Sequence, residues 1–561
     1  MSESYDLLIR GGDILDGSGS PARRGDVAIR DGRIAALGEV SGSARETLDA
    51  SGCAVAPGFV DIHTHYDAQI FWDRLLSISP WHGVTSVVMG NCGFGIAPTR
   101  AEHRDLILRT LENVEGMSLA ALHAGVGEDW PFESFPEYLD AIEARGSAIH
   151  VGALIGHTPL RMYVMGEEST EREATPDEIA RMRAIVKEAL AAGAVGFATS
   201  KAPTHVGYGG RPVPSRQASF EEVLELAGSL REVGHGVTQC TVGAGLFIPQ
   251  LAELQRATGR TVSWTALLQG MFPDALLQST LDTHQQFQSE GVDVFPQVSC
   301  RPLVVEFQFK APFPFESLAI FKEVSAADPA GKRRLYADPA WRQQFRDKAG
   351  DGVLTGSWSD MQITECASAP ELAERPVAEV AAERGVHPAD LVLDLSLADD
   401  LEARFRMPVA NTDESTVAEL LRHPATVLGL SDAGAHASQL CDACAPTHLL
   451  GHWVREKGVL TLEEAVRQLT SATADHFGLQ GRGRLAEGLP ADVCVFDPDT
   501  VGCSPLRRVR DLPAGADRMV SDAEGVRAVI VEGTPVRLDG KDAVDPEGPL
   551  PGRVLRGGRP A

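Results

Sequence analysis

The sequence lacks any run of about 18 uncharged apolar residues, the length that a membrane-spanning helix needs, so no membrane span is expected. Its first residues are acidic and lack the basic and apolar regions of a secretory signal peptide, so none is predicted. Basic residues are also few, because 51 Lys and Arg stand against 78 Asp and Glu and give a formal charge of −27. This charge argues against nucleic acid or an anionic membrane surface as a partner.

Cysteines are sparse as well, and the nine that occur are scattered through 561 residues. An odd, dispersed set is not the disulfide framework of a small secreted domain. Together with the missing signal peptide, this predicts a cytoplasmic protein with reduced thiols. The chain has 43% hydrophobic and 23% charged residues, an ordinary balance for a soluble protein with a large core.

Both ends of the chain contain short strand-type runs that are separated by turn residues. Near the start these are residues 5–10 and 26–38, and near the end they are residues 492–496 and 526–536. Two strand-rich ends around a different middle predict that the termini meet in one small β domain. Residues 549–561 show no apolar periodicity and predict a loose tail.

The middle of the chain alternates short apolar runs with helical patterns. The eight runs are residues 54–60, 84–89, 150–155, 194–198, 236–240, 261–264, 292–295 and 425–430. Continuous apolar runs of this length are typical of strands that are buried on both faces. Eight of them with intervening helices predict the α/β class and a (β/α)8 TIM barrel, with a doubly wound sheet as the alternative.

Two features refine this barrel. Helix starts are indicated at Thr175, followed by Pro176 and Glu178, and at Ser219, followed by Glu222, because Ser or Thr three residues before Glu is typical of a capping box. The stretch 301–423 between the seventh and eighth runs is too long for a simple crossover. It predicts an insertion that caps the active site.

The strongest chemical motif is GFVDIHTH at residues 58–65. Side chains two apart on a strand point the same way, so His63 and His65 would face the barrel mouth together. Two imidazoles that converge there can hold one divalent ion. The alternative is a pair of histidines that only pack or bond locally.

Two further motifs follow predicted strands. Asp432 lies just after the eighth run, where a carboxylate beside metal-bound water can accept a proton and later give it to a leaving nitrogen. Cys92 closes the second run and could offer a thiolate to the same ion. The alternatives are a turn or helix-capping aspartate and a small buried thiol.

These motifs, taken in order, resemble those of the amidohydrolase superfamily, and within it the N-acyl-D-amino-acid deacylase (D-aminoacylase) group. The resemblance spans nearly the whole chain. It rests on residues 56–65, 83–94, 156–161, 193–200, 431–432, 471–479 and 481–493.

The resemblance implies a metal-bearing (β/α)8 barrel at residues 58–484. It also implies a small composite β-sandwich domain built from residues 1–57 and 485–561. Residue by residue, it assigns metal ligation to His63, His65 and Cys92, and the general-base role to Asp432, which also stands in the ligand set.

The chain departs from the family at the fifth and sixth strands, where histidine ligands are expected. Gln239 and Trp264 fall there, with the register open by one or two residues. Tryptophan cannot ligate a metal and glutamine is a poor zinc ligand, so one zinc ion (Zn2+) is favoured over two. Other superfamily members use a carboxylated lysine at the fourth strand. Lys201 is the candidate here, and an ordinary loop lysine is the alternative.

The substrate side is expected around the third and fourth strands. His157 matches a family Gly-His, while Ser200, Tyr208 and Arg211 follow the fourth run, where the deacylases place substrate contacts. Arg211 could pair with a substrate carboxylate through two hydrogen bonds. The alternative is a structural role for His157 and a solvated loop for Arg211.

The expected function is therefore hydrolysis of a small-molecule amide, most directly an N-acyl-D-amino acid, by zinc-activated water with Asp432 as the proton carrier. A cyclic amide, a carbamoyl compound or a lactone would use the same chemistry. A non-catalytic barrel for binding or assembly is the alternative from another class. Amidohydrolase relatives often form homo-oligomers, but no residue here fixes a symmetry.

Overall fold

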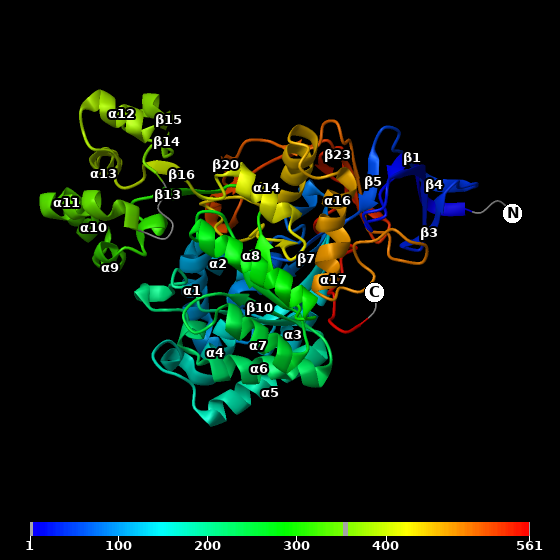
Figure 1. Ribbon diagram of the computed structural model, residues 1–561, viewed down its shortest axis with the longest axis horizontal. Helices are drawn as coiled ribbons and strands as arrows, with labels where there is room; N and C mark the ends of the chain where they lie inside the picture. Colours follow the sequence, from blue (N-terminus) through cyan, green and yellow to red (C-terminus); the bar gives the residue numbers. More distant parts are fainter. Residues whose placement is uncertain (1–3, 352–356, 560–561) are drawn as a thin grey trace.

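The computed structural model describes residues 4–351 and 357–559, and an eight-stranded parallel sheet lies at its centre (Figure 1). Each predicted apolar run contributes one strand to this sheet. In chain order the strands are β6 (Phe59–Asp61), β7 (Val84–Met89), β8 (His150–Gly156), β9 (Gly196–Ser200), β10 (Val237–Thr241), β11 (Val262–Thr265), β12 (Val294–Val298) and β17 (Val427–Leu428). Neighbours in the sheet are neighbours in the chain, as repeated βα units require.

The sheet curls until its first and last strands approach each other. An isolated parallel bridge joins Thr64, just after β6, to Ala433, just after β17, and the His65 amide donates to the Ala433 carbonyl at 2.7 Å. All residues of β7, β8 and β9 are buried. The domain is therefore TIM-barrel-like, with strands covered on both faces.

The first predicted run is divided between two sheets at Gly58. Residues before it form β5 (Ala54–Pro57) in a second sheet, and residues after it form β6 in the barrel. A Cβ atom at Gly58 would collide with the side chain of Thr85 on β7. Glycine therefore lets the backbone pass close to β7 as it changes sheets.

Helices lie between the barrel strands, and both predicted helix starts occur. Thr175 caps α5 (Pro176–Ala192) in a capping box with Glu178. Ser219 caps α6 (Phe220–Val233) by accepting from the Glu222 amide, but the Glu222 side chain turns inward instead of returning to Ser219. This difference matters below, because the inward carboxylate supports the third and fourth strands.

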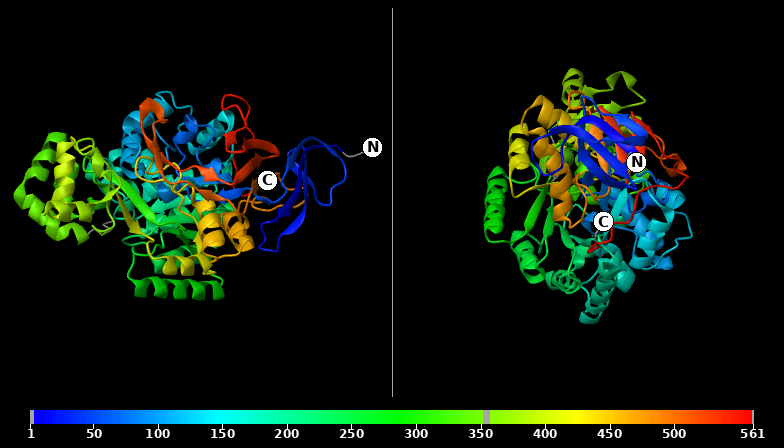
Figure 2. Two further views of the ribbon diagram at one scale, coloured as in Figure 1. Left: turned by 90° about the horizontal axis from the view of Figure 1, so that it is seen from above. Right: turned by 90° about the vertical axis from the view of Figure 1, so that its right-hand side faces the viewer.

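Strands from both ends of the chain form one nine-stranded sheet beside the barrel (Figure 2). Besides β5, its members are β1 (Ser4–Ile14), β2 (Arg23–Arg30), β3 (Arg33–Gly38), β4 (Ser43–Asp49), β18 (Val493–Phe496), β23 (Val526–Val531), β24 (Thr534–Leu538) and β25 (Lys541–Asp542). The C-terminal β18 pairs directly with the N-terminal β5. The termini thus meet in one sheet, as their strand patterns predict.

The predicted loose tail is wrong for residues 549–559. The Gly552 amide donates to the Ser147 carbonyl at 2.8 Å, and the Leu555 amide donates to the Val151 carbonyl at 2.8 Å. Backbone pairing along β8 therefore orders a segment that has no apolar periodicity of its own. Residues 560–561 lie outside the described part of the chain.

A separate lobe stands between the seventh and eighth barrel strands, at the end of the molecule opposite the terminal sheet (Figures 1 and 2). Its sheet consists of β13 (Leu303–Gln308), β16 (Arg404–Ala410), β14 (Gln362–Glu365) and β15 (Arg375–Pro376). The accompanying helices are α9 (Lys322–Ala326), α10 (Pro329–Ala337), α11 (Pro339–Lys348), α12 (Val377–Arg384) and α13 (Pro388–Ala398).

The lobe has its own apolar core, in which Phe309, Phe315 and Phe405 are buried. It ends earlier than the predicted boundary at residue 423, because α14 (Glu414–Arg422) packs with the barrel core instead. Among the described residues, no helix is both long and apolar enough to cross a membrane.

Candidate metal centre and cavity

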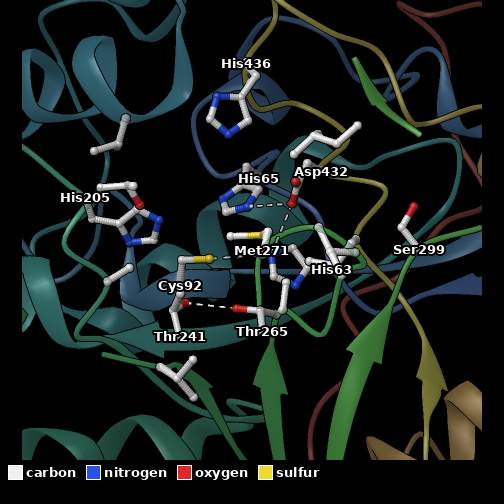
Figure 3. A pocket seen from close by; sticks show the side chains of 18 of the residues that line it. His63, His65, Cys92, His205, Thr241, Thr265, Met271, Ser299, Asp432 and His436 are labelled. Atoms are coloured by element: carbon white, nitrogen blue, oxygen red, sulfur yellow. Dashed lines mark hydrogen bonds and ion pairs between the residues drawn. The ribbon is translucent and has the colours of Figure 1, made fainter. Parts of the chain in front are cut away.

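A cavity of about 360 Å³ opens at the carboxyl ends of the barrel strands, and four candidate ligands converge on its floor (Figure 3). His63 and His65 follow β6, Cys92 follows β7, and Asp432 follows β17. Catalytic groups of TIM-barrel enzymes lie at this end of the strands. Closure of the curled sheet therefore brings the two ends of the barrel together: Ser431, the residue before Asp432, contacts His63 across 368 positions of the chain.

The two imidazoles share one face of the extended chain, with ring centroids 5.3 Å apart. Asp432 Oδ1 lies 3.2 Å from His63 Nε2 and 3.6 Å from His65 Nε2. Burial raises the pKa of the Asp432 carboxyl, but the charges of His63 and His65 outweigh burial and hold it well below its usual range. Asp432 is therefore a carboxylate at neutral pH.

Cys92 presents its sulfur to the same point, 3.5 Å from His63 Nε2. The residue lies in a tight turn after β7 with φ of +56°. Burial would raise the pKa of the thiol, but the neighbouring His63 and His65 lower it to about 7. A substantial thiolate fraction is thus available at neutral pH as a metal ligand.

The spacing of these donors fits one zinc-type ion. Bonds of about 2.0–2.3 Å place tetrahedral ligand atoms about 3.3–3.8 Å from one another. The separations of 3.2, 3.5 and 3.6 Å between the imidazole, thiol and carboxylate atoms lie close to this range. The ligand atoms of His63, His65 and Cys92 all fall within 4.8 Å of one another. Imidazole, thiolate and carboxylate are also the donors that zinc prefers.

Two residues that the sequence did not single out hold the imidazoles in place. Gln297 Oε1 on β12 accepts from His63 Nδ1 at 2.7 Å, and Glu115 Oε1, at the end of α1 (Arg104–Glu115), lies 3.2 Å from His65 Nδ1. With Nδ1 hydrogen-bonded in His63 and within ion-pair distance of a carboxylate in His65, each ring presents Nε2 to the candidate ion. Gln297 lies two residues after the end of a predicted run, so its inward direction could have been foreseen. Glu115 has no such local signal.

The fifth-strand position is occupied by Gln239, as expected, but the glutamine does not face the ion. Its Oε1 accepts from the Cys92 amide at 2.7 Å, so it fixes the turn that carries the thiol. The placement of Trp264 at the sixth-strand ligand position is wrong. Trp264 lies on the opposite face of β11, where its indole donates to His284 Nε2 at 2.9 Å, and Thr265 lines the cavity instead. Alternation of side chains along a strand explains the one-residue slip.

The structure does not bring Lys201 to the candidate metal centre. Its ammonium points away from the cavity and donates to the backbone carbonyls of Arg216, at 3.0 Å, and Ala218. Burial lowers the pKa of Lys201 to about 8. With its ammonium held by these carbonyls, Lys201 is a structural lysine at the end of β9.

The expected substrate contacts are also displaced from the cavity. His157 is fully buried between Glu222 Oε1, at 2.9 Å, and Thr199 Oγ1, at 2.8 Å. Ser200 bonds to His205 Nδ1 at 2.6 Å, and of these two only His205 lines the cavity.

Tyr208 and Arg211 line a different, outer hollow. The Arg211 side chain is 56% exposed and its guanidinium lies 3.7 Å from Glu171, so it is a solvated loop arginine. The expectation that Arg211 clamps a substrate at the metal centre is therefore wrong, because its loop turns outward after β9.

Comparison with known proteins places this geometry in a family. The amidohydrolase family profile matches residues 46–332 and 336–537. The D-aminoacylase of Alcaligenes xylosoxydans xylosoxydans is 32% identical over 538 residues, which cover 95% of this chain and 95% of the relative. The N-acyl-D-glutamate deacylase of the same organism is 32% identical over 569 residues, which cover 99% of this chain and 97% of the relative.

A solved structure is similar over the same length. The N-acyl-D-glutamate deacylase of Bordetella bronchiseptica, complexed with zinc and a phosphonate inhibitor that mimics the tetrahedral intermediate, matches with a TM-score of 0.67 and 28% identity. The match covers 99% of this chain and 100% of that chain. With the profile matching most of the sequence, the chain belongs to the amidohydrolase family.

Proposed function

We propose that the protein hydrolyses the amide bond of a small N-acyl compound, an N-acyl-D-amino acid or a similar amide, at a single zinc ion. The observation that carries this proposal is the convergence of His63, His65, Cys92 and Asp432 at one point of the cavity floor. The names of the relatives, a D-aminoacylase and an N-acyl-D-glutamate deacylase, support the same bond type.

Four side chains would hold the ion: His63 and His65 through Nε2, Cys92 through sulfur and Asp432 through Oδ1. When bound, such a cation supplies the Lewis acidity that polarises a carbonyl and acidifies water. Gln297 sets the direction of the His63 imidazole through its hydrogen bond at Nδ1, and the Glu115 carboxylate lies beside Nδ1 of His65 as an ion-pair partner. Ser431 fixes the strand end by donating to the His63 carbonyl at 3.1 Å.

Asp432 has the properties of the proton carrier. Its depressed pKa keeps it ionised, and 21% of its side chain is exposed to the cavity. It can accept the proton of the attacking water and then deliver it to the leaving nitrogen, which must be protonated to depart as an amine. The apolar walls of the cavity limit competing water during this transfer.

We also propose the finer features of the architecture and setting. The curled sheet closes into a (β/α)8 barrel at residues 58–484, and the strands of the terminal segments 1–57 and 485–561 form a composite β-sandwich, apart from residues 549–559, which pair along β8. The Thr64–Ala433 bridge and the shared nine-stranded sheet support these assignments. All nine cysteines are free thiols, which supports a reducing, cytoplasmic setting.

Metal content and acyl release together test the proposed function. Protein purified without chelator should hold about one equivalent of zinc and should release carboxylic acid from a panel of N-acyl-D-amino acids and related amides, with less release from the L-enantiomers. Zinc below roughly a tenth of an equivalent that is not recovered on adding the metal would contradict the proposal and favour a binding or assembly role.

A further inference from the structure

The walls of the cavity combine apolar surface with acidic groups. Apolar residues reach it from the segments that follow β10 and β11 and from the inserted lobe. They are Val242, Phe247, Leu268, Met271, Phe272, Leu303, Val305 and Phe313. Beside the metal cluster, Glu115 and Asp442 add carboxylates to that of Asp432. The described lining residues include neither lysine nor arginine, and residues 352–356 contain none in sequence.

Four cationic side chains on the segments around the cavity are engaged elsewhere. Arg301 Nε donates to Asp442 Oδ1 at 2.7 Å, so its charge neutralises a cavity carboxylate. Arg216 donates to the His205 carbonyl at 3.1 Å, and Lys201 donates to carbonyls behind the cavity wall. Arg211 lies in the outer hollow. None of these groups is directed at a ligand in the cavity.

Two imidazoles outside the metal cluster also line the cavity, those of His205 and His436. His205 is held by Ser200 Oγ at Nδ1, and burial lowers its pKa to about 3, so it is neutral. The Nδ1 atom of His436 is buried and has no hydrogen-bond partner in the described structure.

A free carboxylate on the apolar walls, away from the metal ligands, would be desolvated without a lysine or arginine partner among the described lining residues. It would also lie near Glu115, whose side chain is only 7% exposed. Buried charges without a partner are strongly disfavoured, whereas amide and ester groups lose little in an apolar cavity if they keep one hydrogen bond. The cavity therefore discriminates by charge at the amine side of the scissile bond.

We propose that the substrate is an uncharged, largely apolar amide whose amine part carries no free carboxylate, such as an N-acyl-D-amino acid blocked as an amide or ester. This inference rests on the proposed function and narrows it. It follows from the apolar lining, from the lack of lysine and arginine among the described lining residues, and from the engagement of Arg301, Arg216 and Lys201 with other groups. The stereochemical and acyl preferences of the site are separate from this charge selection.

A matched pair of compounds tests the charge selection. N-acetyl-D-phenylalanine and its N-methylamide differ only in the carboxyl group, and both release acetate on deacylation by the zinc-loaded protein. The N-methylamide should have a kcat/KM at least about tenfold higher. Equal values, or a preference for the free acid, would overturn the inference and leave the proposed function standing.

Binding of the same two compounds distinguishes the charge selection from the proposed amide hydrolysis when no hydrolysis is observed. The zinc-loaded Asp432→Asn variant should bind the N-methylamide more tightly than the acid in calorimetric titrations. If neither compound is hydrolysed by the unmodified protein but this order of binding holds, the charge inference survives and the proposed function fails. If neither compound binds, or the acid binds more tightly, the charge inference is wrong.

The charge selection can also be tested in the opposite direction, by introducing a lysine into the cavity wall. Met271 is a partly exposed, unbranched wall residue, so lysine fits its place with little change in volume. Met271→Lys should raise kcat/KM for the free acid about tenfold and leave the N-methylamide unimproved. The matched Met271→Gln variant, which adds polarity without charge, should keep the original preference. A gain for the acid in Met271→Gln would show that polarity, and not charge, sets the selection.

Discussion

Asp432 carries the proposed proton transfer, so its carboxylate is the first residue to test. In Asp432→Asn the amide cannot accept a proton, and kcat should fall about 10²–10⁴-fold. Asparagine tolerates the positive φ of 45° at this position, so the backbone should persist. Steady-state acetate release from the substrate pair above, on samples of equal zinc content, measures the effect.

A matched control exists for this substitution. Asp400 also has a positive φ, at 56°, but its side chain is 81% exposed on the inserted lobe. Asp400→Asn should leave kcat unchanged. If Asp432→Asn retained full activity with unchanged metal content, Asp432 would be a ligand or structural group and not the base.

Substitution of Gln297 tests whether zinc binding depends on the hydrogen bond that orients the His63 imidazole. Gln297→Leu removes the acceptor for His63 Nδ1, so the ring can rotate or change tautomer. Zinc affinity, measured by competition with a chelator, should weaken about 10–100-fold. Ser263→Ala removes only the hydroxyl that accepts from Gln297 Nε2 at 3.0 Å and should weaken affinity less. Equal losses would indicate that the strand packing, and not the acceptor, governs the site.

At the residue scale, the sequence predicted the positions whose direction depends on local periodicity. His63 and His65 share a face because a strand alternates, and Asp432 and Cys92 follow strand ends. The predicted placement of Trp264 was wrong for the same reason, because a slip of one residue along a strand exchanges its two faces. Glu115 was out of reach as a partner because tertiary packing alone brings it to the cavity.

At the scale of elements, α6 supports the third and fourth strands through the inward carboxylate of Glu222. This buried group accepts from Arg161 at 2.5 Å and from His157 at 2.9 Å. Burial would raise the pKa of Glu222, but these two partners lower it to about 2. Glu222→Gln leaves Arg161, whose side chain is 0% exposed, without its counter-charge. The free energy of unfolding should fall by about 3–5 kcal/mol at pH 7.

The pH dependence of this loss has a definite sign. Because the folded pKa is depressed, the stabilisation is fully present above the unfolded value of about 4.5 and is lost as pH falls toward 2. Urea unfolding at several pH values measures the free energy of unfolding of the unmodified protein and of Glu222→Gln. The difference between these two free energies should shrink below pH ~4.5. Glu383→Gln, at the exposed Arg375 pair, should show little effect. A difference in unfolding free energy that stays constant with pH would contradict the proposed dependence of stability on the ionisation of Glu222.

Gly58 tests the passage of the chain between two sheets. Gly58→Ala places a Cβ atom against Thr85, and the overpacking should cost about 1–3 kcal/mol in the free energy of unfolding. Gly228 in α6 has open space around its missing side chain. Gly228→Ala should therefore stabilise the protein by about 0.5–1 kcal/mol. Denaturant melts compare the two, and destabilisation by Gly228→Ala alone would contradict this account.

Elements with strong local patterns were predictable, and those that depend on distant partners were not. The eight apolar runs and the caps at Thr175 and Ser219 reflect local burial and local hydrogen bonds. The end of the inserted lobe was misplaced because α14 differs from the lobe helices only in the core that it joins. The segment after residue 549 gains order from β8, which no pattern within that segment could reveal.

At the scale of the whole molecule, the inserted lobe and the terminal sheet lie at opposite ends (Figure 2). The lobe contributes Leu303, Val305 and Phe313 to the cavity, so it shapes the substrate side. The terminal sheet instead joins the amino ends of the strands, where His150 begins β8. This division predicts that substitutions at the sheet–barrel junction change stability and leave the chemistry intact.

Asp492 is the junction residue that tests this division. Its buried carboxylate accepts from Arg482, from His150 Nε2 at 3.0 Å and from the Glu532 amide at 3.0 Å. Asp492→Asn leaves the Arg482 charge buried with only the more distant Glu532, and the free energy of unfolding should fall by about 3–5 kcal/mol.

The junction variant should keep its zinc affinity and its kcat/KM at 25 °C, because the cavity lies at the other end of the strands. Asp475→Asn breaks a pair of similar geometry with Arg484, at 2.8 and 2.6 Å, but there both side chains are exposed. It should cost no more than about 1 kcal/mol. Urea melts and activity assays on the same samples separate the two properties. Loss of activity in folded Asp492→Asn would mean that the terminal sheet and the metal centre are coupled through the barrel.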